Sequence, residues 1–350
     1  MATKEALKPK EALADREALA EKLQIRSILC PVDFSDFSRR AFHYALSLGR
    51  HFGSRLFIQH TAQTPVNLLL EGVGPAGIQE SVQGQLLRSR EEVRRMLISM
   101  GVDSSEVTIL LNEGDVPDRI RETIGRERID LLVMGTHGHK GFSRLVLGSV
   151  TEGMIHQAVC PVLVVSRSEG DSADPEQGVR FRTILLATDF SHHSDRALTY
   201  ALKWGWEWNS KVVLFHAVEK PAPAMHGLVD LFPEYNPYFE QQVARAWERI
   251  RDLVPQSARE RQQVVYEVRH GNPKEEILRV AEEKHADLII TGARGMERSA
   301  APWGSVRFAA GEETQASQAL HKTFHPWGSV SSAVVRDGRF PVLVVRELTA

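Results

Sequence analysis

The stretch DLLVMGTHGHKGFSRLVLGSVT, residues 130–151, decides the fold of this chain. It starts with a short apolar run at residues 131–134, which is typical of a parallel strand that helices cover on both faces. Two glycines follow, and after nine more residues the pair Gly148-Ser149 opens a helical segment, with Ser149 expected as its N-cap. Because glycines bare backbone N–H groups and a helix N-terminus attracts anions, this spacing predicts a phosphate-binding loop. The loop lacks the Gly-Lys-Ser/Thr end of a Walker motif.

Length and composition bound the class of protein. With 350 residues, the chain exceeds what one hydrophobic core usually holds, so two domains are expected. A net charge of −2 argues against nucleic-acid or membrane-surface binding, and no apolar run is long enough to predict a membrane-spanning helix. The charged N-terminus lacks a signal-peptide core, and two cysteines cannot form a disulfide framework, so a cytoplasmic location is expected. We interpret Cys30 and Cys160 as buried small side chains.

An internal repeat divides the chain. Three pairs of segments align without gaps, namely residues 27–60 with 183–216, 113–138 with 270–295, and 160–165 with 340–345. The repeat predicts two tandem domains, at residues 25–167 and 180–347. A polar linker at residues 168–179, rich in Gly, Pro and Asp, is expected to join them. Residues 1–24 are expected to form a helical extension, either frayed or bound to a partner.

Strand-like and helix-like segments alternate in each half. The expected strands of the first half are residues 27–31, 56–59, 107–111, 131–134 and 161–165, and residues 264–268 and 341–345 match two of them in the second half. The alternation predicts an α/β fold of two tandem doubly wound domains, each a five-stranded, mostly parallel, Rossmann-like sheet with helices on both faces. Such sheets bind ligands beyond the strand carboxyl ends, where the strand order reverses. We therefore expect Asp33 and Gly135, which follow the first and fourth strands, around one ligand.

The second half carries an insertion near residues 302–326. The word PWGSV occurs twice, at residues 302–306 and 326–330. The first copy lies at nearly the expected distance from Gly295, whereas the second lies at the expected distance from the last strand. The sequence leaves open which copy closes the second glycine loop.

The words PVDFS, VMGTHG, GSVTE and CPVLVV occur in that order, and they resemble the nucleotide-binding motifs of the universal stress protein family. The resemblance covers both halves and implies a fold like that of the adenine-nucleotide alpha hydrolases. It implies that ATP or a related adenine nucleotide, with or without Mg²⁺, lies across the sheet edge. Asp33 would accept hydrogen bonds from the ribose hydroxyls. The adenine would be lined by Pro31, Val32, Thr61 and Met134, and the phosphates would be held by Gly135, Gly138, Gly148, Ser149, Val150 and Thr151. The alternative for Asp33 is a turn or helix-capping carboxylate.

A second, weaker site is expected in the second half. It would be formed by Ala187, Thr188, Asp189, Gly292, Gly295, Gly328, Ser329 and Val330. The pair Ala187-Thr188 departs from the Pro-Val of the first half, and the insertion separates the closing Gly-Ser from its loop. Lys140 and Arg144 would contact phosphate or be exposed loop cations. The repeated His60 and His216 are expected to have a structural role, and we predict no catalytic residue and no metal site.

Three functions fit these features. The first is an ATP-binding stress-response regulatory protein that acts through its conformation or assembly. The second is a slow ATPase or another nucleotide-dependent enzyme of the same superfamily, and the third is an interaction scaffold without a ligand. The resemblance also implies that the last strands of the two halves, which would otherwise be unpaired sheet edges, pair within the chain. A homodimer and an unidentified protein partner are further expectations, and nucleic acid and membrane are not expected partners.

Overall fold

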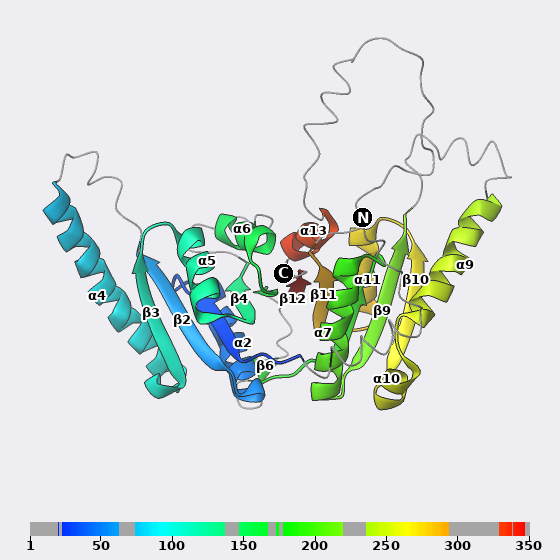
Figure 1. Ribbon diagram of the computed structural model, residues 1–350, viewed down its shortest axis with the longest axis horizontal. Helices are drawn as coiled ribbons and strands as arrows, with labels where there is room; N and C mark the ends of the chain where they lie inside the picture. Colours follow the sequence, from blue (N-terminus) through cyan, green and yellow to red (C-terminus); the bar gives the residue numbers. More distant parts are fainter. Residues whose placement is uncertain are drawn as a thin grey trace, which may run out of the picture.

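The chain is seen in a computed structural model that describes residues 20, 23–62, 74–136, 147–166, 173–174, 178–219, 236–293, 329–337 and 339–346. Most of the expected N-terminal extension, the insertion near 302–326 and the residues Gly138, Lys140, Arg144, Gly295 and Gly328 lie outside these ranges. The described residues form a ten-stranded sheet with helices on both faces and a short two-stranded sheet (Figure 1). None of the described helices is long and apolar enough to cross a membrane.

The first half contains every strand that the sequence predicted. Its elements are β1 (Ser27–Pro31), α2 (Asp36–Phe52), β2 (Arg55–Ala62), α4 (Pro75–Ser99), the 3₁₀ helix η1 (Ser104–Glu106), β3 (Val107–Glu113), α5 (Val116–Glu127), β4 (Leu131–Gly135), α6 (Ser149–Gln157) and β5 (Val162–Val165). All five strands are parallel, in the order β3-β2-β1-β4-β5. This confirms the predicted α/β fold.

The second half repeats this arrangement. Its elements are β8 (Thr183–Ala187), α7 (His192–Trp208), β9 (Lys211–Val218), α9 (Asn236–Asp252), α10 (Gln256–Arg261), β10 (Val264–His270), α11 (Pro273–Glu283), β11 (Leu288–Gly292), α13 (Ser329–Asp337) and β12 (Val342–Val345). The strands are again parallel, in the order β10-β9-β8-β11-β12. Between the halves, β6 (Ala173–Asp174) and β7 (Gly178–Val179) form the short antiparallel sheet.

The two halves are joined edge to edge. Strands β5 and β12 pair antiparallel, with Leu163 opposite Leu343 at the centre of the register. Each strand is the last of its half, so the pairing covers two apolar edges that would otherwise be open. The result is one sheet that runs through the whole molecule, as the resemblance implied for the last strands (Figure 1).

Each sheet face has its own hydrophobic core. Side chains alternate across β1, so Ile28 and Cys30 pack with α2 and α4, whereas Leu29 packs with α5 and α6. The α2/α4 face continues into α7 and α9, and the α5/α6 face continues into α11 and α13. Both cysteines are buried and form no disulfide, as predicted, and burial raises the pKa of the Cys160 thiol to about 12.

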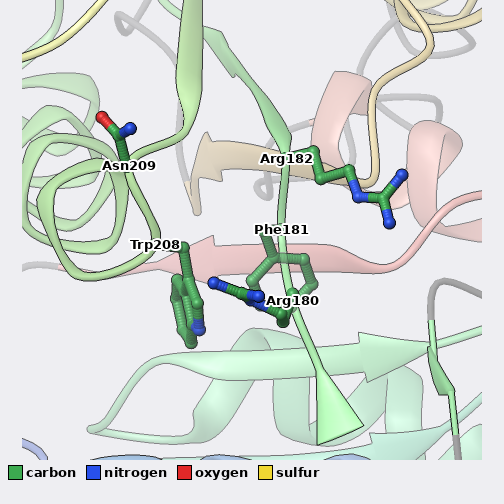
Figure 2. Close-up of a pocket in the computed structure, with 5 residues that line it drawn as sticks. All are labelled: Arg180, Phe181, Arg182, Trp208 and Asn209. Atoms are coloured by element: carbon green, nitrogen blue, oxygen red, sulfur yellow. The ribbon is translucent and has the colours of Figure 1, made fainter. Parts of the chain in front are cut away.

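Aromatic side chains fill the junction of the two halves on the α2/α4 face. The buried ring of Phe181, which precedes β8, stacks on Trp204 with 5.5 Å between centroids and meets Trp208 edge-on at 5.1 Å. Tyr44 of the first half lies 6.5 Å from the same ring. Figure 2 shows Phe181, Trp208 and Arg180 together, in a hollow that Arg182 and Asn209 also line. The junction therefore has an aromatic core in addition to the strand pairing.

Candidate functional site

The candidate site lies where the strand order of the first half reverses. Strand β1 pairs with β2 on one side and with β4 on the other, and the register aligns Ile28 with Leu131. The chain passes from β1 to β2 and β3, and then returns to place β4 and β5 on the opposite side. Ligands bind such sheets beyond the carboxyl ends of the strands at this point. Asp33 and Gly135 stand at those ends, as the sequence analysis expected.

Asp33 forms a turn that starts α2. Its Oδ1 accepts hydrogen bonds from the backbone N–H of Ser35 (3.1 Å) and from the Ser35 hydroxyl (2.6 Å). Ser35 in turn caps α2 by accepting from the Ser38 N–H, while Phe34 takes a left-handed conformation with φ 66°. Asp33 thus acts as a turn carboxylate, which is the alternative role given in the sequence analysis. A carboxylate has further lone pairs, so the ribose contact stays a prediction.

The second half reproduces this turn. Asp189 Oδ1 accepts from the Ser191 N–H at 3.0 Å, Ser191 caps α7 through Ser194, and Phe190 has φ 62°. The repeat of a strained φ at a non-glycine residue indicates that the same local geometry is held in both halves.

His60 and His216 stabilise these two turns. The Nδ1–H of His60 donates to the carbonyl of Val32 over 2.8 Å, and its ring lies 4.7 Å from that of Phe34. His216 repeats the bond at 2.8 Å to Thr188. Burial lowers the pKa of His216, although its hydrogen bond to Thr188 and the charge of Asp189 act in the opposite direction. The predicted structural role of both histidines is confirmed.

Gly135 allows α2 to approach β4. A Cβ on Gly135 would lie 2.8 Å from the backbone carbonyl carbon and oxygen of Phe37, closer than real Cβ contacts. In the second half, a Cβ on Gly292 would lie 3.0 Å from the carbonyl carbon of His193. Sequence reasoning gave these glycines a role in phosphate binding and missed this packing role. A side chain at Gly135 would therefore disturb the fold as well as any ligand.

The start of α6 differs from the sequence prediction by one residue. Gly148, and not Ser149, is the N-cap, because Gly148 is extended (φ −60°, ψ 136°) and its carbonyl accepts the Glu152 N–H. The Gly148 N–H donates to the Thr136 carbonyl at 2.8 Å, so the two ends of the glycine loop meet. Among the described residues, no side chain caps this helix. Its first-turn N–H groups can therefore be offered to an anion.

In the second half, the helix that corresponds to α6 begins within the second PWGSV copy, of which the structure describes Ser329 and Val330. Helix α13 begins at Ser329 within that copy, and its bounds match those of α6 residue for residue. The Ser331 hydroxyl donates to the Gly292 carbonyl at 2.6 Å, as the Thr151 hydroxyl donates to Gly135 at 2.8 Å. The sequence left this choice open, because it depends on which segment packs beside the end of β11.

The expected adenine-lining residues divide between the two faces. Met134 packs in the core of the α5/α6 face, and strand alternation places Pro31 and Thr61 on that same face. Val32 packs in the opposite core, so it can offer only backbone atoms on the α5/α6 side. The structure thus brings three of the four side chains to one face.

Strand β1 leaves the end of β2 uncovered. The last β1–β2 pair is Pro31 with Gln59, and the Val32 N–H donates to the Gln59 carbonyl at 2.8 Å. Beyond this point, β3 is the only described strand that pairs with β2, up to Ala62. Because backbone groups alternate between neighbouring strands, those of Thr61 face the uncovered side. We call residues 60–62 the β2 end segment.

Sequence reasoning missed Gln59, the residue of β2 that comes just before the β2 end segment. Its side chain is 1% exposed, and its Oε1 has no hydrogen-bond partner among the described residues. The repeat contained a signal for it, because residue 215, which aligns with residue 59, is phenylalanine. Within the described ranges, no group of His, Cys, Asp and Glu is arranged to hold a metal ion.

Comparisons with a family model and with known proteins both point to universal stress proteins. A model of the Universal stress protein family matches residues 24–166 and 180–346. A universal stress protein of Methanocaldococcus jannaschii is 31% identical over 144 residues, which are 41% of this chain and 82% of that protein. One from Thermus aquaticus is 30% identical over 140 residues, 40% of this chain and 98% of that protein.

Solved structures share the fold over nearly the whole length. A universal stress protein from Archaeoglobus fulgidus covers 93% of this chain and 99% of its own, with a TM-score of 0.59 and 22% identity. A functionally unknown protein from Pseudomonas aeruginosa covers 95% of both chains, with a TM-score of 0.54 and 14% identity. At these identities the likeness concerns the fold.

Proposed function

Since the chain belongs to the Universal stress protein family, we propose that it is a stress-response regulatory protein that binds ATP at the carboxyl edge of its first half. The observation that carries the proposal is the meeting of three segments at the strand-order reversal. These are the Asp33 turn, the end of β4 at Gly135 and the uncapped start of α6. Contacts link them in series, because Gly135 lies against Phe37 of α2 and accepts a hydrogen bond from Thr151 of α6.

The start of α6 suits the phosphates. Its first-turn N–H groups and the positive end of its dipole favour negative charge, and the Thr136–Gly148 bond fixes the base of the loop that leads to it. The Thr151 hydroxyl is already bonded to Gly135, so Thr151 offers the phosphates its backbone N–H. A bound Mg²⁺ would add charge neutralisation to these contacts.

The Asp33 turn and the β2 end segment suit the nucleoside. The Asp33 carboxylate is half-buried and held in place by Ser35, which limits the entropy lost when it accepts ribose hydroxyl donors. The uncovered backbone at Thr61 and the side chains of Pro31 and Met134 would flank the base. The second half keeps the Asp189 turn, and we propose that it binds more weakly.

Contacts of α6 with the other half support a regulatory role. Glu152 of α6 forms an ion pair with Arg336 of α13, and the Arg346 guanidinium donates to the carbonyl of His156. Phosphate held at the start of α6 would therefore act on a helix that belongs to the junction. A ligand that prefers one arrangement of that junction shifts the population of conformations or of homodimers.

Isothermal titration of the full chain with ATP, with and without Mg²⁺, tests the proposal. Asn in place of Asp33 keeps an oxygen for Ser35 but removes the charge, so D33N is expected to weaken ATP binding about tenfold. The matched variant D189N is expected to have a smaller effect. Unchanged affinity in D33N, or no binding by the wild-type chain, would contradict the proposal.

Two parallel measurements separate the other functions. ATP turnover in the same samples distinguishes a slow ATPase from a binding protein. Light scattering with and without ATP reports whether a homodimer depends on the ligand. A chain that neither binds nor hydrolyses ATP would be the interaction scaffold.

A further inference from the structure

Gln59 lies in a position where the fold does not need an amide. It pairs with Pro31 at the last β1–β2 contact and is 1% exposed. The residue at the same place in the second half is Phe215, which pairs with Ala187, accepts the Thr188 N–H at 2.9 Å and is also 1% exposed. An apolar ring thus fills this position in one half of the molecule.

The amide of Gln59 is only partly satisfied. Its Nε2 donates to the Thr61 hydroxyl over a long 3.4 Å, and its Oε1 has no partner among the described residues. Buried polar groups are nearly always hydrogen-bonded, because an unpaired buried acceptor loses its contacts with water. An orphaned carbonyl oxygen at this depth indicates a partner that the described residues do not supply.

The position of the amide connects it with the proposed nucleotide site. Strand alternation places Gln59 on the α5/α6 face, together with Pro31, Thr61 and Met134. Its Nε2 already reaches Thr61 in the β2 end segment. The amide therefore lies next to the segment that would flank the base in the proposed site.

We propose that Gln59 is a specificity-determining residue that recognises the exocyclic amine of the adenine base; this inference rests on the proposed function. A carboxamide has one acceptor and two donor hydrogens, and adenine offers an amine donor beside a ring-nitrogen acceptor. In this proposal the Oε1 accepts from the 6-amino group, and the Nε2 hydrogen that does not bond to Thr61 donates to the neighbouring ring nitrogen. Phe215 has neither group, so base recognition of this kind belongs to the first half.

The test compares ATP with purine riboside triphosphate, which lacks the 6-amino group and has no polar group in its place. This analogue keeps the ring nitrogens but leaves the Oε1 of Gln59 without the amine donor. A site with a buried polar group discriminates against a ligand that leaves the group unpaired. Titration of the wild-type chain is expected to give about tenfold tighter binding of ATP than of the analogue.

Gln59→Met keeps the length of the side chain and removes the amide. We expect this variant to reduce the preference for ATP at least threefold, mainly through weaker ATP binding. Gln59→Leu serves as a second variant, and thermal unfolding of both checks that they fold. Phe215→Met is the matched control in the second half and is expected to leave the preference unchanged. D33N is expected to weaken both ligands by the same factor.

The outcomes separate this inference from the proposed function. If the wild-type chain binds ATP and Gln59→Met keeps the wild-type preference, the inference is wrong and the proposed function stands. If the wild-type chain binds neither triphosphate, both are wrong. A preference that falls in Gln59→Met and Gln59→Leu, but not in Phe215→Met, supports the inference.

Discussion

The Thr151 hydroxyl donates a 2.8 Å hydrogen bond to the backbone carbonyl of Gly135, and so fastens the start of α6 to the end of β4. Thr151 is buried, so water cannot replace it as a donor. Ser331 and Gly292 form the corresponding bond in the second half. In both halves, a hydroxyl in the first turn of the helix that follows the glycine loop therefore joins this helix to the preceding strand.

Replacement of Thr151 by Val is expected to destabilise the chain. The two side chains have nearly the same shape, but Val leaves the buried Gly135 carbonyl without its donor, at a cost of about 1–3 kcal/mol. Thr151→Ser keeps the hydroxyl and is the control. Urea unfolding measures both variants, and equal stability of the two would show that the bond contributes nothing.

Gly135→Ala is expected to destabilise the fold by about 1–3 kcal/mol, because its Cβ would press on the backbone of Phe37. Gly153 in α6 provides the comparison, since a Cβ there meets nothing within 4 Å. Gly153→Ala should raise stability by about 0.5–1 kcal/mol, as expected for a glycine inside a helix. Chemical denaturation of the pair checks the prediction, which fails if the two changes have the same sign.

The stability of the chain is expected to depend on pH through His216. Burial lowers the pKa of His216 in the folded state, so near pH 6 the unfolded chain binds more protons than the folded one. The free energy of unfolding then falls as the pH drops below the ordinary histidine value, by at most about 1.4 kcal/mol per pH unit for one group.

His216→Asn removes this titration while keeping a donor near the position of Nδ1. We expect its unfolding free energy to change less than that of the wild-type chain between about pH 7 and pH 5. Urea titrations at several pH values give the two slopes. Identical slopes would mean that His216 does not contribute to the pH dependence.

Phe181→Ala is expected to weaken the junction of the halves. The Phe181 ring is fully buried between Trp204, Trp208 and Tyr44, and truncation of such a ring costs about 3–5 kcal/mol. Its exposed neighbour Arg180, shown in Figure 2, is the control, and Arg180→Ala should change stability by less than about 0.5 kcal/mol. Thermal unfolding followed by tryptophan fluorescence reports on the same rings. A loss in F181A no larger than in R180A would contradict the prediction.

Local patterns predicted most of the elements but not their ends. Every expected strand is present, because short apolar runs between turn residues suit a buried parallel strand whatever lies around them. The start of α6 was misplaced by one residue, since both Gly148 and Ser149 are suitable N-caps. The extended backbone of Gly148 and the hydrogen bond from the Glu152 N–H to its carbonyl distinguish them.

By itself, the sequence determined the repeated α/β order, the Asp33 and Asp189 turns and the burial of both cysteines, because periodicity and capping act over a few neighbouring residues. Tertiary structure decided the pairing of β5 with β12, the PWGSV copy that begins α13 and the contact of Gly135 with Phe37. It also decided that the Gln59 amide is buried with its Oε1 unpaired among the described residues. These features depend on atoms that are far apart in the chain and meet only when the sheet and its covering helices are packed together.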